Sequence, residues 1–252
     1  FGDKPIRSPY LVNTPDFVAC HVPSYLGKYD LLKGLKDGGT FLLNSVWDAE
    51  TTKEHLPDAM KKYMAEHHIN FYIINATKIA AEIGLGSRTN TIMQSAFFKV
   101  TGVIPYETAK EEMKKAIYKS YGKKGEEIVN MNYAAIDKAA SELKEIAVPA
   151  EWANATTGAS PVKLADDKYF QEVIHPILAL QGDKLPSSAF NADGHVPTGT
   201  TRFEKRGVAV KVPAWNAENC IQCNQCAFVC PHACIRPALV KDGSEVPASF
   251  AT

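Results

Sequence analysis

The first 150 residues show two periods of hydrophobic and polar positions. Short apolar runs predict strands at residues 16–20, 40–44 and 69–75. Apolar residues at helical spacing predict helices at residues 28–35, 52–68, 77–83, 91–101, 106–121 and 125–146. Strands that alternate with helices are typical of parallel sheets with crossover helices. We therefore expect an α/β fold in which helices flank a Rossmann-like open parallel sheet.

Prolines mark two changes in this pattern. Pro57 lies inside the second helical segment, where proline removes a hydrogen-bond donor and disfavours a continuous helix. Residues 149–215 are rich in proline and glycine and have few periodic runs, which indicates an extended connector or a small irregular domain. The clearest element there is a helical segment at residues 167–180, and Pro176 cuts it.

Small polar residues follow each predicted strand. They are Cys20 and His21, Asn44 and Ser45, and residues 75–77 (NAT). In open α/β sheets, ligands bind beyond the carboxyl ends of the strands, so these residues could line a crevice. Turns also begin at strand ends and favour small polar residues, so a purely structural role fits these positions equally well.

A glycine-containing turn precedes the predicted helix at residues 91–101. Its sequence, Gly84-Leu-Gly-Ser-Arg88-Thr89-Asn90, leads into a helix N-terminus, where unpaired N–H groups and the helix dipole attract anions. The guanidinium group of Arg88 would add a fork for phosphate. The same residues also fit a plain turn with an N-cap, which is the commoner case.

The most specific motif is the cysteine run near the end of the sequence. Cys220, Cys223, Cys226 and Cys230, followed by Pro231, have the spacing C-x2-C-x2-C-x3-C-P of bacterial ferredoxins. The first three thiols aim at one [4Fe-4S] cluster, and the fourth ligates the neighbouring cluster in two-cluster ferredoxins. The sequence therefore predicts these four cysteines as cluster ligands.

Structural zinc and disulfides fit the cysteine spacing less well. Structural zinc sites pair two C-x2-C knuckles across a long spacer, and here the third and fourth thiols come too soon. Disulfides suit small secreted domains, but the rest of the chain carries only Cys20 and Cys234. We interpret Cys234, which lies outside the ligand pattern, as a small buried apolar residue.

Charge and hydropathy exclude some classes of function. The 252 residues include 28 lysines and arginines and 28 aspartates and glutamates, so the formal net charge is zero and no basic field attracts nucleic acid. No apolar run is long enough to span a bilayer, and the N-terminus lacks a signal-peptide profile. Clustered free thiols indicate a reducing compartment, most simply the cytoplasm.

Several stretches together resemble one known family. They are residues 1–10 (FGDKPIRSPY), 39–45 (GTFLLNS), 86–94 (GSRTNTIMQ) and 197–207 (PTGTTRFEKRG), followed by the cysteine run. In this combination and order the chain resembles the pyruvate:ferredoxin (flavodoxin) oxidoreductases of the 2-oxoacid:acceptor oxidoreductase family. The fourth stretch contains Glu204-Lys205-Arg206, the letters that name the family's EKR linker region.

The resemblance implies an internal fragment of a larger enzyme. Residues 1–150 would be a gamma-type, coenzyme A-associated α/β domain that lacks its opening strand, residues 151–214 the EKR linker region, and residues 215–252 the start of a two-cluster ferredoxin-like domain. The whole enzyme would convert pyruvate and coenzyme A to acetyl-CoA and CO2. Thiamine diphosphate and Mg2+ would bind outside this fragment, which should therefore be inactive alone.

The resemblance also implies partners. Arg88, Thr89 and Asn90 would contribute to the coenzyme A site, and ferredoxin or flavodoxin would accept the electrons. The full-length enzyme would be a homodimer that contacts neither nucleic acid nor membrane. Three alternatives stay open: a separate iron–sulfur electron carrier or adaptor, a family member that acts on another 2-oxoacid, and a zinc-knuckle binding module.

Overall fold

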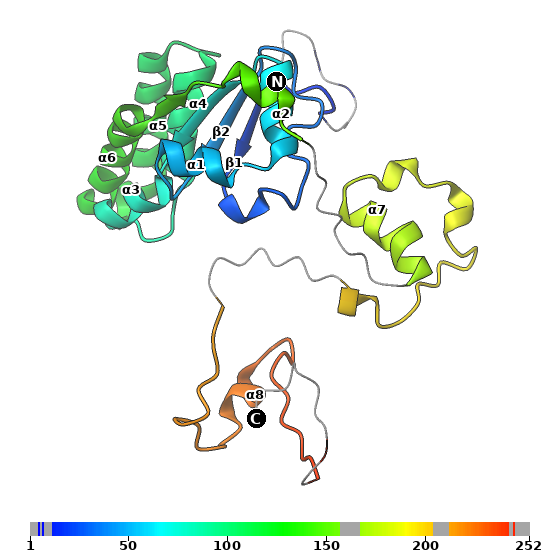
Figure 1. Ribbon diagram of the computed structural model, residues 1–252. Coiled ribbons are helices and arrows are strands. Elements are labelled where there is room, and N and C mark those ends of the chain that lie inside the picture. The colour runs from blue at the N-terminus through cyan, green and yellow to red at the C-terminus, as the bar shows by residue number, and fades with distance from the viewer. Residues whose placement is uncertain are drawn as a thin grey trace. The chain divides into compact units, whose positions relative to one another are not determined.

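A computed structural model describes residues 5, 7, 12–156, 167–203, 212–241 and 244. The chain divides into two compact units, Phe1–Val208 and Ala209–Thr252 (Figure 1). Residues 204–206, the EKR letters, lie outside the described residues, as does most of the stretch 1–10. No helix within the described ranges combines the length and apolar content needed to cross a membrane.

The first unit carries most of the regular structure. Its strands are β1 (Phe17–Cys20), β2 (Thr40–Asn44), β3 (Asn70–Ile74) and β4 (Lys144–Ile146). Its α-helices are α1 (Ala49–His55), α2 (Asp58–Glu66), α3 (Ala76–Ile83), α4 (Asn90–Thr101), α5 (Tyr106–Tyr121), α6 (Glu126–Glu142) and α7 (His175–Leu178). Short 3-10 turns lie at Pro23–Tyr25, Gly122–Lys124, Ala150–Asn154, Gly182–Lys184, Ser187–Ala189 and Thr200–Phe203. The second unit has one described helix, α8 (Gln225–Val229).

The sheet has the strand order β1-β2-β3-β4. The first three strands are parallel, with Phe17 opposite Thr40 and Phe41 opposite Phe71. This confirms the predicted α/β fold with flanking helices. The fourth strand pairs antiparallel to β3, with Ile146 opposite Phe71, so the sheet is mixed. The helix predicted over residues 125–146 is wrong at its end, because Leu143 adopts an extended backbone that ends α6 before β4.

Alternate residues of the strands face two separate hydrophobic layers. Phe41, Leu43, Phe71 and Ile73 pack with the buried methionines of α2 on one face. Leu42 and Ile74, with Tyr72 alongside, point to the other face, where residues of α3, α4 and α6 cover them. Figure 1 shows the sheet between these two groups of helices. The result is a three-layer arrangement in which the carboxyl ends of the parallel strands lie at one edge.

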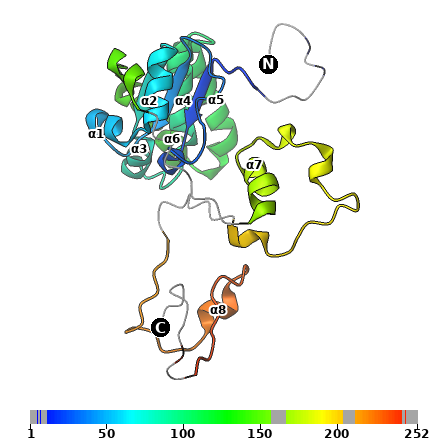
Figure 2. The same cartoon turned by 45° about the vertical axis from the view of Figure 1, so that its right-hand side comes forward.

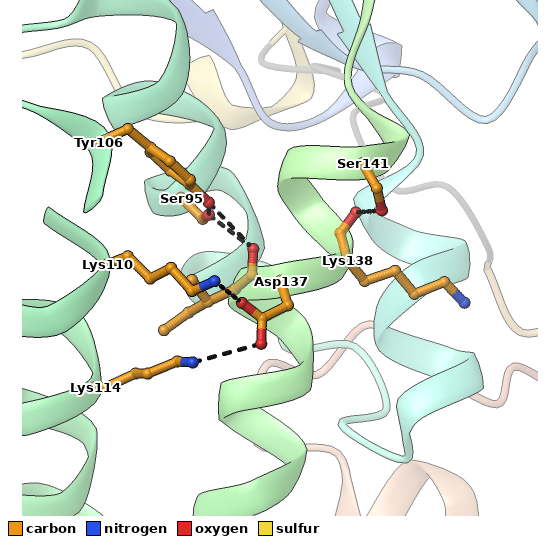
Figure 3. A network of polar contacts seen from close by, with 8 residues as sticks. Ser95, Tyr106, Lys110, Lys114, Asp137, Lys138 and Ser141 are labelled. Carbon is orange, nitrogen blue, oxygen red and sulfur yellow. Dashed lines mark hydrogen bonds and ion pairs between the residues drawn. The ribbon is translucent and has the colours of Figure 1, made fainter.

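Polar contacts join α5 to the helices beside it (Figure 3). The buried Ser95 hydroxyl of α4 donates to the Ile136 carbonyl oxygen of α6 at 3.0 Å and also contacts the Tyr106 hydroxyl at 3.0 Å. At the surface, the Lys110 ammonium of α5 lies 2.5 Å from the Asp137 carboxylate of α6. These contacts hold α5 as an outer helix on α6.

Two further helix predictions need correction. Residues 28–35 form consecutive turns and not a helix, because Gly34 has a φ of +75° and its α-carbon packs close to the Asn13 carbonyl oxygen. The predicted helix at 52–68 is two helices, which separate at Pro57. The first begins at residue 49, because the Asp48 carboxylate accepts a hydrogen bond from the Thr51 N–H at 2.8 Å.

Besides its short 3-10 turns, the described part of the connector after β4 contains a helical segment around Pro176. It contains a π-helical turn, Phe170–Ile174, that leads directly into α7. Pro176 cannot donate a hydrogen bond to an earlier carbonyl group, and the wider turn before it accommodates this loss. Phe170 packs on Phe203, with ring centroids 5.0 Å apart. Figure 2 shows this segment, with α7, from a second direction.

Candidate functional site

At the carboxyl edge of the sheet, Asn44 joins three chain segments. Its side-chain N–H groups donate to the His21 carbonyl oxygen at 3.0 Å and to the Thr77 hydroxyl at 3.2 Å. Its side-chain oxygen accepts from the Ala76 backbone N–H at 3.0 Å. The Asn44 amide is buried and fully paired within the protein. A structural role therefore accounts for this residue, which is the role expected of a polar residue at a turn.

The segment after β2 is held by a second buried polar pair. The Ser45 and Thr52 hydroxyls lie 2.8 Å apart, and the Trp47 backbone N–H donates to the Ser45 hydroxyl at 3.1 Å. The Thr52 hydroxyl donates in turn to the Asp48 carbonyl oxygen at 2.6 Å. These bonds fix the path from β2 into α1. The polar side chains at this strand end therefore stabilise the turn between β2 and α1.

The turn between α3 and α4 is different, because the side chains of Arg88 and Thr89 form no hydrogen bond with any described residue. Gly84 ends α3 with a φ of +88°, and the buried Leu85 anchors the turn to the core. Thr89 is the N-cap of α4, but its side chain accepts no capping hydrogen bond. Arg88 is exposed, and its guanidinium group forms no ion pair or hydrogen bond with any described residue.

Arg88, Thr89 and Asn90 therefore gather at one helix N-terminus, as the sequence predicted. Within the described part of the chain, no side chain accepts from the first backbone N–H groups of α4, and the helix dipole makes this end electropositive. An anionic ligand could accept hydrogen bonds from these N–H groups and from the Arg88 guanidinium group. The arrangement has the chemistry of a phosphate-binding turn.

The cysteine run lies in the second unit around α8. The backbone adopts left-handed conformations at Gln222 (φ 55°) and Asn224 (φ 61°), which fold the chain into tight turns between the thiols. Cys223 and Cys226 are exposed. Among the described residues, no three His, Cys, Asp or Glu side chains converge on a point that could hold a metal ion. The ligands of metal sites are often brought together only when the metal binds, because binding is coupled to folding.

The surroundings of two of the four motif cysteines lower the pKa of the thiol. The backbone N–H of Gln222 and the side chain of Trp215 lower the pKa of Cys220. The backbone N–H groups of Cys234 and His232 lower the pKa of Cys230, and the first of these lies 3.3 Å from the sulfur. Such donors stabilise the thiolate form, which is the form that ligates metals. The donor set therefore fits an iron–sulfur cluster.

The remaining two cysteines differ from this pattern. Cys20 is buried at the end of β1, and burial raises the pKa of its thiol, so this thiol is the inert one. Cys234 is exposed, which corrects the interpretation that it is a buried apolar residue. Its position follows from the turn after Cys230, where Ala233 has a φ of +50° and the backbone is drawn toward the Cys230 sulfur.

Two residues at these sites have roles that the sequence did not predict. Trp215 lies five positions before the cysteine run, and no motif includes it. Asn44 was expected at a strand end, but its role as a bridge between three segments was not. The sequence feature that could have indicated this role is the position of Asn44, a polar residue that directly follows three apolar residues at the end of its strand.

Comparison with known protein families gives three matches in order along the chain. Residues 1–142 match the family described as pyruvate ferredoxin/flavodoxin oxidoreductase. Residues 157–209 match the EKR domain, a domain of unknown function. Residues 212–235, which include all four motif cysteines, match a 4Fe-4S binding domain.

Curated relatives match the whole chain. The pyruvate:ferredoxin oxidoreductase of Moorella thermoacetica is 53% identical over 100% of this chain and 22% of its own length. A pyruvate-flavodoxin oxidoreductase of Klebsiella pneumoniae is 47% identical over 99% of this chain and 21% of its own. The mitochondrial pyruvate dehydrogenase [NADP(+)] of Euglena gracilis is 40% identical over 100% and 14%. The chain thus spans about a fifth of the length of the first two relatives, and it belongs to the pyruvate ferredoxin/flavodoxin oxidoreductase family.

Proposed function

We propose that this chain is part of an enzyme that oxidatively decarboxylates pyruvate with coenzyme A and passes the electrons through iron–sulfur clusters. The observation that carries the proposal is the 53% identity to a pyruvate:ferredoxin oxidoreductase along the entire chain. In this proposal residues 1–150 form the coenzyme A-associated domain, residues 151–214 the linker region, and residues 215–252 the start of a two-cluster ferredoxin-like domain.

Cys220, Cys223 and Cys226 are the proposed ligands of one [4Fe-4S] cluster, and Cys230 is the proposed ligand of the next. The match to a 4Fe-4S binding domain and the lowered pKa values of Cys220 and Cys230, which favour the thiolate, support this assignment. A bound cluster supplies one-electron transfer. The chain's own contribution is to hold the thiolates and to neutralise part of their charge with backbone N–H groups.

Arg88, Thr89 and Asn90 are the proposed coenzyme A-binding residues of this chain. Coenzyme A carries phosphate groups, and an exposed arginine beside an uncapped helix N-terminus attracts phosphate. Because Arg88 has no ion-pair partner among the described residues, a ligand phosphate would not have to displace one. This turn would therefore orient the ligand by charge, and it would take no part in proton transfer.

The remaining parts of the proposal lie outside the chain. Thiamine diphosphate and Mg2+ would bind to other domains of the same oxidoreductase and supply the carbon–carbon bond cleavage, so this chain alone would be inactive. Ferredoxin or flavodoxin would accept the electrons, as the names of two relatives state for those proteins. The full-length enzyme would be a homodimer in the cytoplasm.

The test is anaerobic purification of the full-length protein followed by an assay with pyruvate, coenzyme A and either ferredoxin or flavodoxin. We expect acetyl-CoA formation that requires all three, and slower turnover with 2-oxobutyrate or 2-oxoglutarate. Faster turnover with another 2-oxoacid would show that this other acid, and not pyruvate, is the substrate. A protein with iron and acid-labile sulfide that turns over no 2-oxoacid, but passes electrons to the acceptors after reduction by dithionite, would be an electron carrier. A colourless zinc protein would contradict the cluster assignment.

A further inference from the structure

The chain directly after Cys230 turns back onto the sulfur of that residue. The Ala233 backbone N–H donates to the Cys230 carbonyl oxygen at 3.3 Å, and the Cys234 backbone N–H donates to the Cys230 sulfur at 3.3 Å. Ala233 has a φ of +50°, and its carbonyl oxygen accepts from the Arg236 side chain at 2.9 Å. All these bonds lie within residues 230–236. The turn is therefore local, and it places Cys234 beside Cys230.

This turn brings the two cysteines within reach of a disulfide. A backbone nitrogen is two bonds from its own β-carbon, so the 3.3 Å contact also brings the Cys234 side chain close to the Cys230 sulfur. Disulfides join β-carbons that are about 3.5–4.5 Å apart. The Cys234 thiol lies 3.9 Å from the His232 carbonyl oxygen, and a rotation about its Cα–Cβ bond turns it toward Cys230.

Cys234 has no other role that the structure explains. It is exposed, so packing in a hydrophobic core does not account for it, and it lies outside the ligand spacing of the cysteine run. Within the described residues, Cys234 is the cysteine that forms a hydrogen bond with the Cys230 sulfur. Only three residues separate the two thiols, so each presents itself to the other at an effective concentration on the order of millimolar.

We propose that Cys234 forms a disulfide with Cys230 when an oxidant removes the iron–sulfur cluster, and that this bond protects Cys230 from irreversible oxidation. The protective role rests on the proposed ligation of a cluster by Cys230. Once the thiol of Cys230 is free, hydrogen peroxide oxidises it to a sulfenic acid and one water is formed. The Cys234 sulfur then attacks the Cys230 sulfur, so that the S–O bond breaks, the S–S bond forms and a second water leaves.

The overall reaction converts two thiols and one hydrogen peroxide into one disulfide and two waters. A sulfenic acid without a neighbouring thiol is instead oxidised further to sulfinic and sulfonic acids, which a thiol reductant does not reverse. A dithiol reductant does open a disulfide by exchange and returns both thiols. The turn at Cys234 therefore keeps Cys230 in a form from which a cluster can be rebuilt.

The experiment exposes the full-length enzyme, purified anaerobically with its clusters, to hydrogen peroxide. Wild type, Cys234→Ser and Cys234→Ala are compared. Free thiols are alkylated with iodoacetamide, disulfides are then reduced and labelled with N-ethylmaleimide, and mass spectrometry locates each label. We expect N-ethylmaleimide on both Cys230 and Cys234 in the wild type, and about tenfold more sulfinic and sulfonic acid at Cys230 in the two variants. Cys20, which is buried, should stay reduced in every sample.

A second measurement follows the rebuilding of the cluster. After peroxide, treatment with dithiothreitol, ferrous iron and sulfide should restore the EPR signal that depends on Cys230 in the wild type but not in Cys234→Ser. A disulfide between Cys230 and another motif cysteine, or equal irreversible oxidation of Cys230 in all three proteins, would overturn the role of Cys234. Absence of clusters in the untreated wild type, or a complete set of cluster signals in Cys230→Ser, would instead overturn the proposed ligation.

Discussion

The side-chain oxygen of Asn44 accepts a hydrogen bond from the Ala76 backbone N–H at 3.0 Å. This bond connects the end of β2 to the first residue of α3, across the neighbouring strand end. Ala76 belongs to the first turn of α3, where backbone N–H groups have no partner within the helix. Asn44 of β2 therefore supplies a hydrogen-bond acceptor to the first turn of α3, a helix that follows a different strand, β3.

Replacing Asn44 by alanine should destabilise the first unit by about 3 kcal/mol, because the buried Ala76 N–H and the His21 carbonyl group lose their partner. The free energy of unfolding, measured by urea titration followed by circular dichroism, checks this expectation. Asn70→Ala is the matched control. Asn70 is exposed and its side chain donates to the Gly38 carbonyl oxygen at 2.8 Å, so its loss should cost ~1 kcal/mol or less. Equal costs would contradict the bridging role of Asn44.

Because of the ion pairs between α5 and α6, part of the free energy of unfolding should be lost at acidic pH. Burial alone would raise the pKa of Asp137, but the hydrogen bond from Lys110 and the charge of Lys114 outweigh it and hold the pKa below its ordinary value of 3.8 (Figure 3). A lowered folded-state pKa means that this contribution is fully present above pH ~4 and is lost as the pH falls through the folded pKa. The Asp137 side chain is half exposed, so its contribution is small, ~1 kcal/mol or less.

Asp137→Asn should therefore reduce stability at neutral pH and have a smaller effect at acidic pH, because the wild-type carboxyl group gains its proton as the pH falls through its folded pKa. Thermal unfolding at the two pH values, at low and high salt, measures the difference. Glu112→Gln is the control, because the pair that Glu112 forms with Lys115 lies within α5 and joins no second helix. An Asp137→Asn effect that is as large at low pH as at neutral pH would show that packing, and not charge, is responsible.

Substitutions of different cysteines in and beside the cysteine run should have different effects on the clusters. In the full-length enzyme, Cys223→Ser should remove the EPR signal of one cluster, and Cys230→Ser should spare that cluster and damage its neighbour. Cys234→Ser should leave both clusters intact, because its thiol is exposed and lies outside the ligand spacing. Iron and acid-labile sulfide analysis with EPR spectroscopy separates these results. Loss of the same signal in Cys223→Ser and Cys230→Ser would contradict the assignment of Cys230 to a second cluster.

The local pattern of apolar and polar residues predicted the parallel strands and most of the helices. The segment at 40–44 is β2 and the segment at 106–121 is α5, because one has a run of buried apolar residues and the other has a long helical period closed by glycine. The cysteine spacing predicted the iron–sulfur chemistry for the same reason: the information lies within 11 consecutive residues.

Features that depend on residues distant in sequence could not be predicted in this way. The segment that contains Leu32 and Leu35 has helical spacing, yet the chain turns at Gly34 to fit beside Asn13. Lys144–Ile146 becomes a strand only because the edge of β3 is available for pairing. The chain just before Cys220 folds into a turn that the Asn216 side chain closes, and no periodic pattern records such a turn.

The turn before α4 makes the sharpest prediction for coenzyme A. Arg88→Ala in the full-length enzyme should raise the KM for coenzyme A by about ten- to a hundredfold, because a charge-assisted hydrogen bond to phosphate contributes about 1.5–3 kcal/mol. The kcat at saturating coenzyme A should stay unchanged, since Arg88 would bind the ligand equally in the ground and transition states. Stability should also stay unchanged, because Arg88 is exposed and pairs with no described residue.

Steady-state kinetics at varied coenzyme A, together with the dissociation constant from isothermal titration calorimetry, measure this effect. Lys99→Ala is the matched control, because Lys99 is a cation on the last turn of the same helix and lies over the Tyr106 ring, 4.9 Å from its centroid. It should leave the KM unchanged, whereas Arg88→Lys should fall between the wild type and Arg88→Ala, since lysine keeps the charge but loses the fork. Equal KM values in Arg88→Ala and Lys99→Ala would mean that this helix N-terminus is only a turn, and that coenzyme A phosphates bind elsewhere.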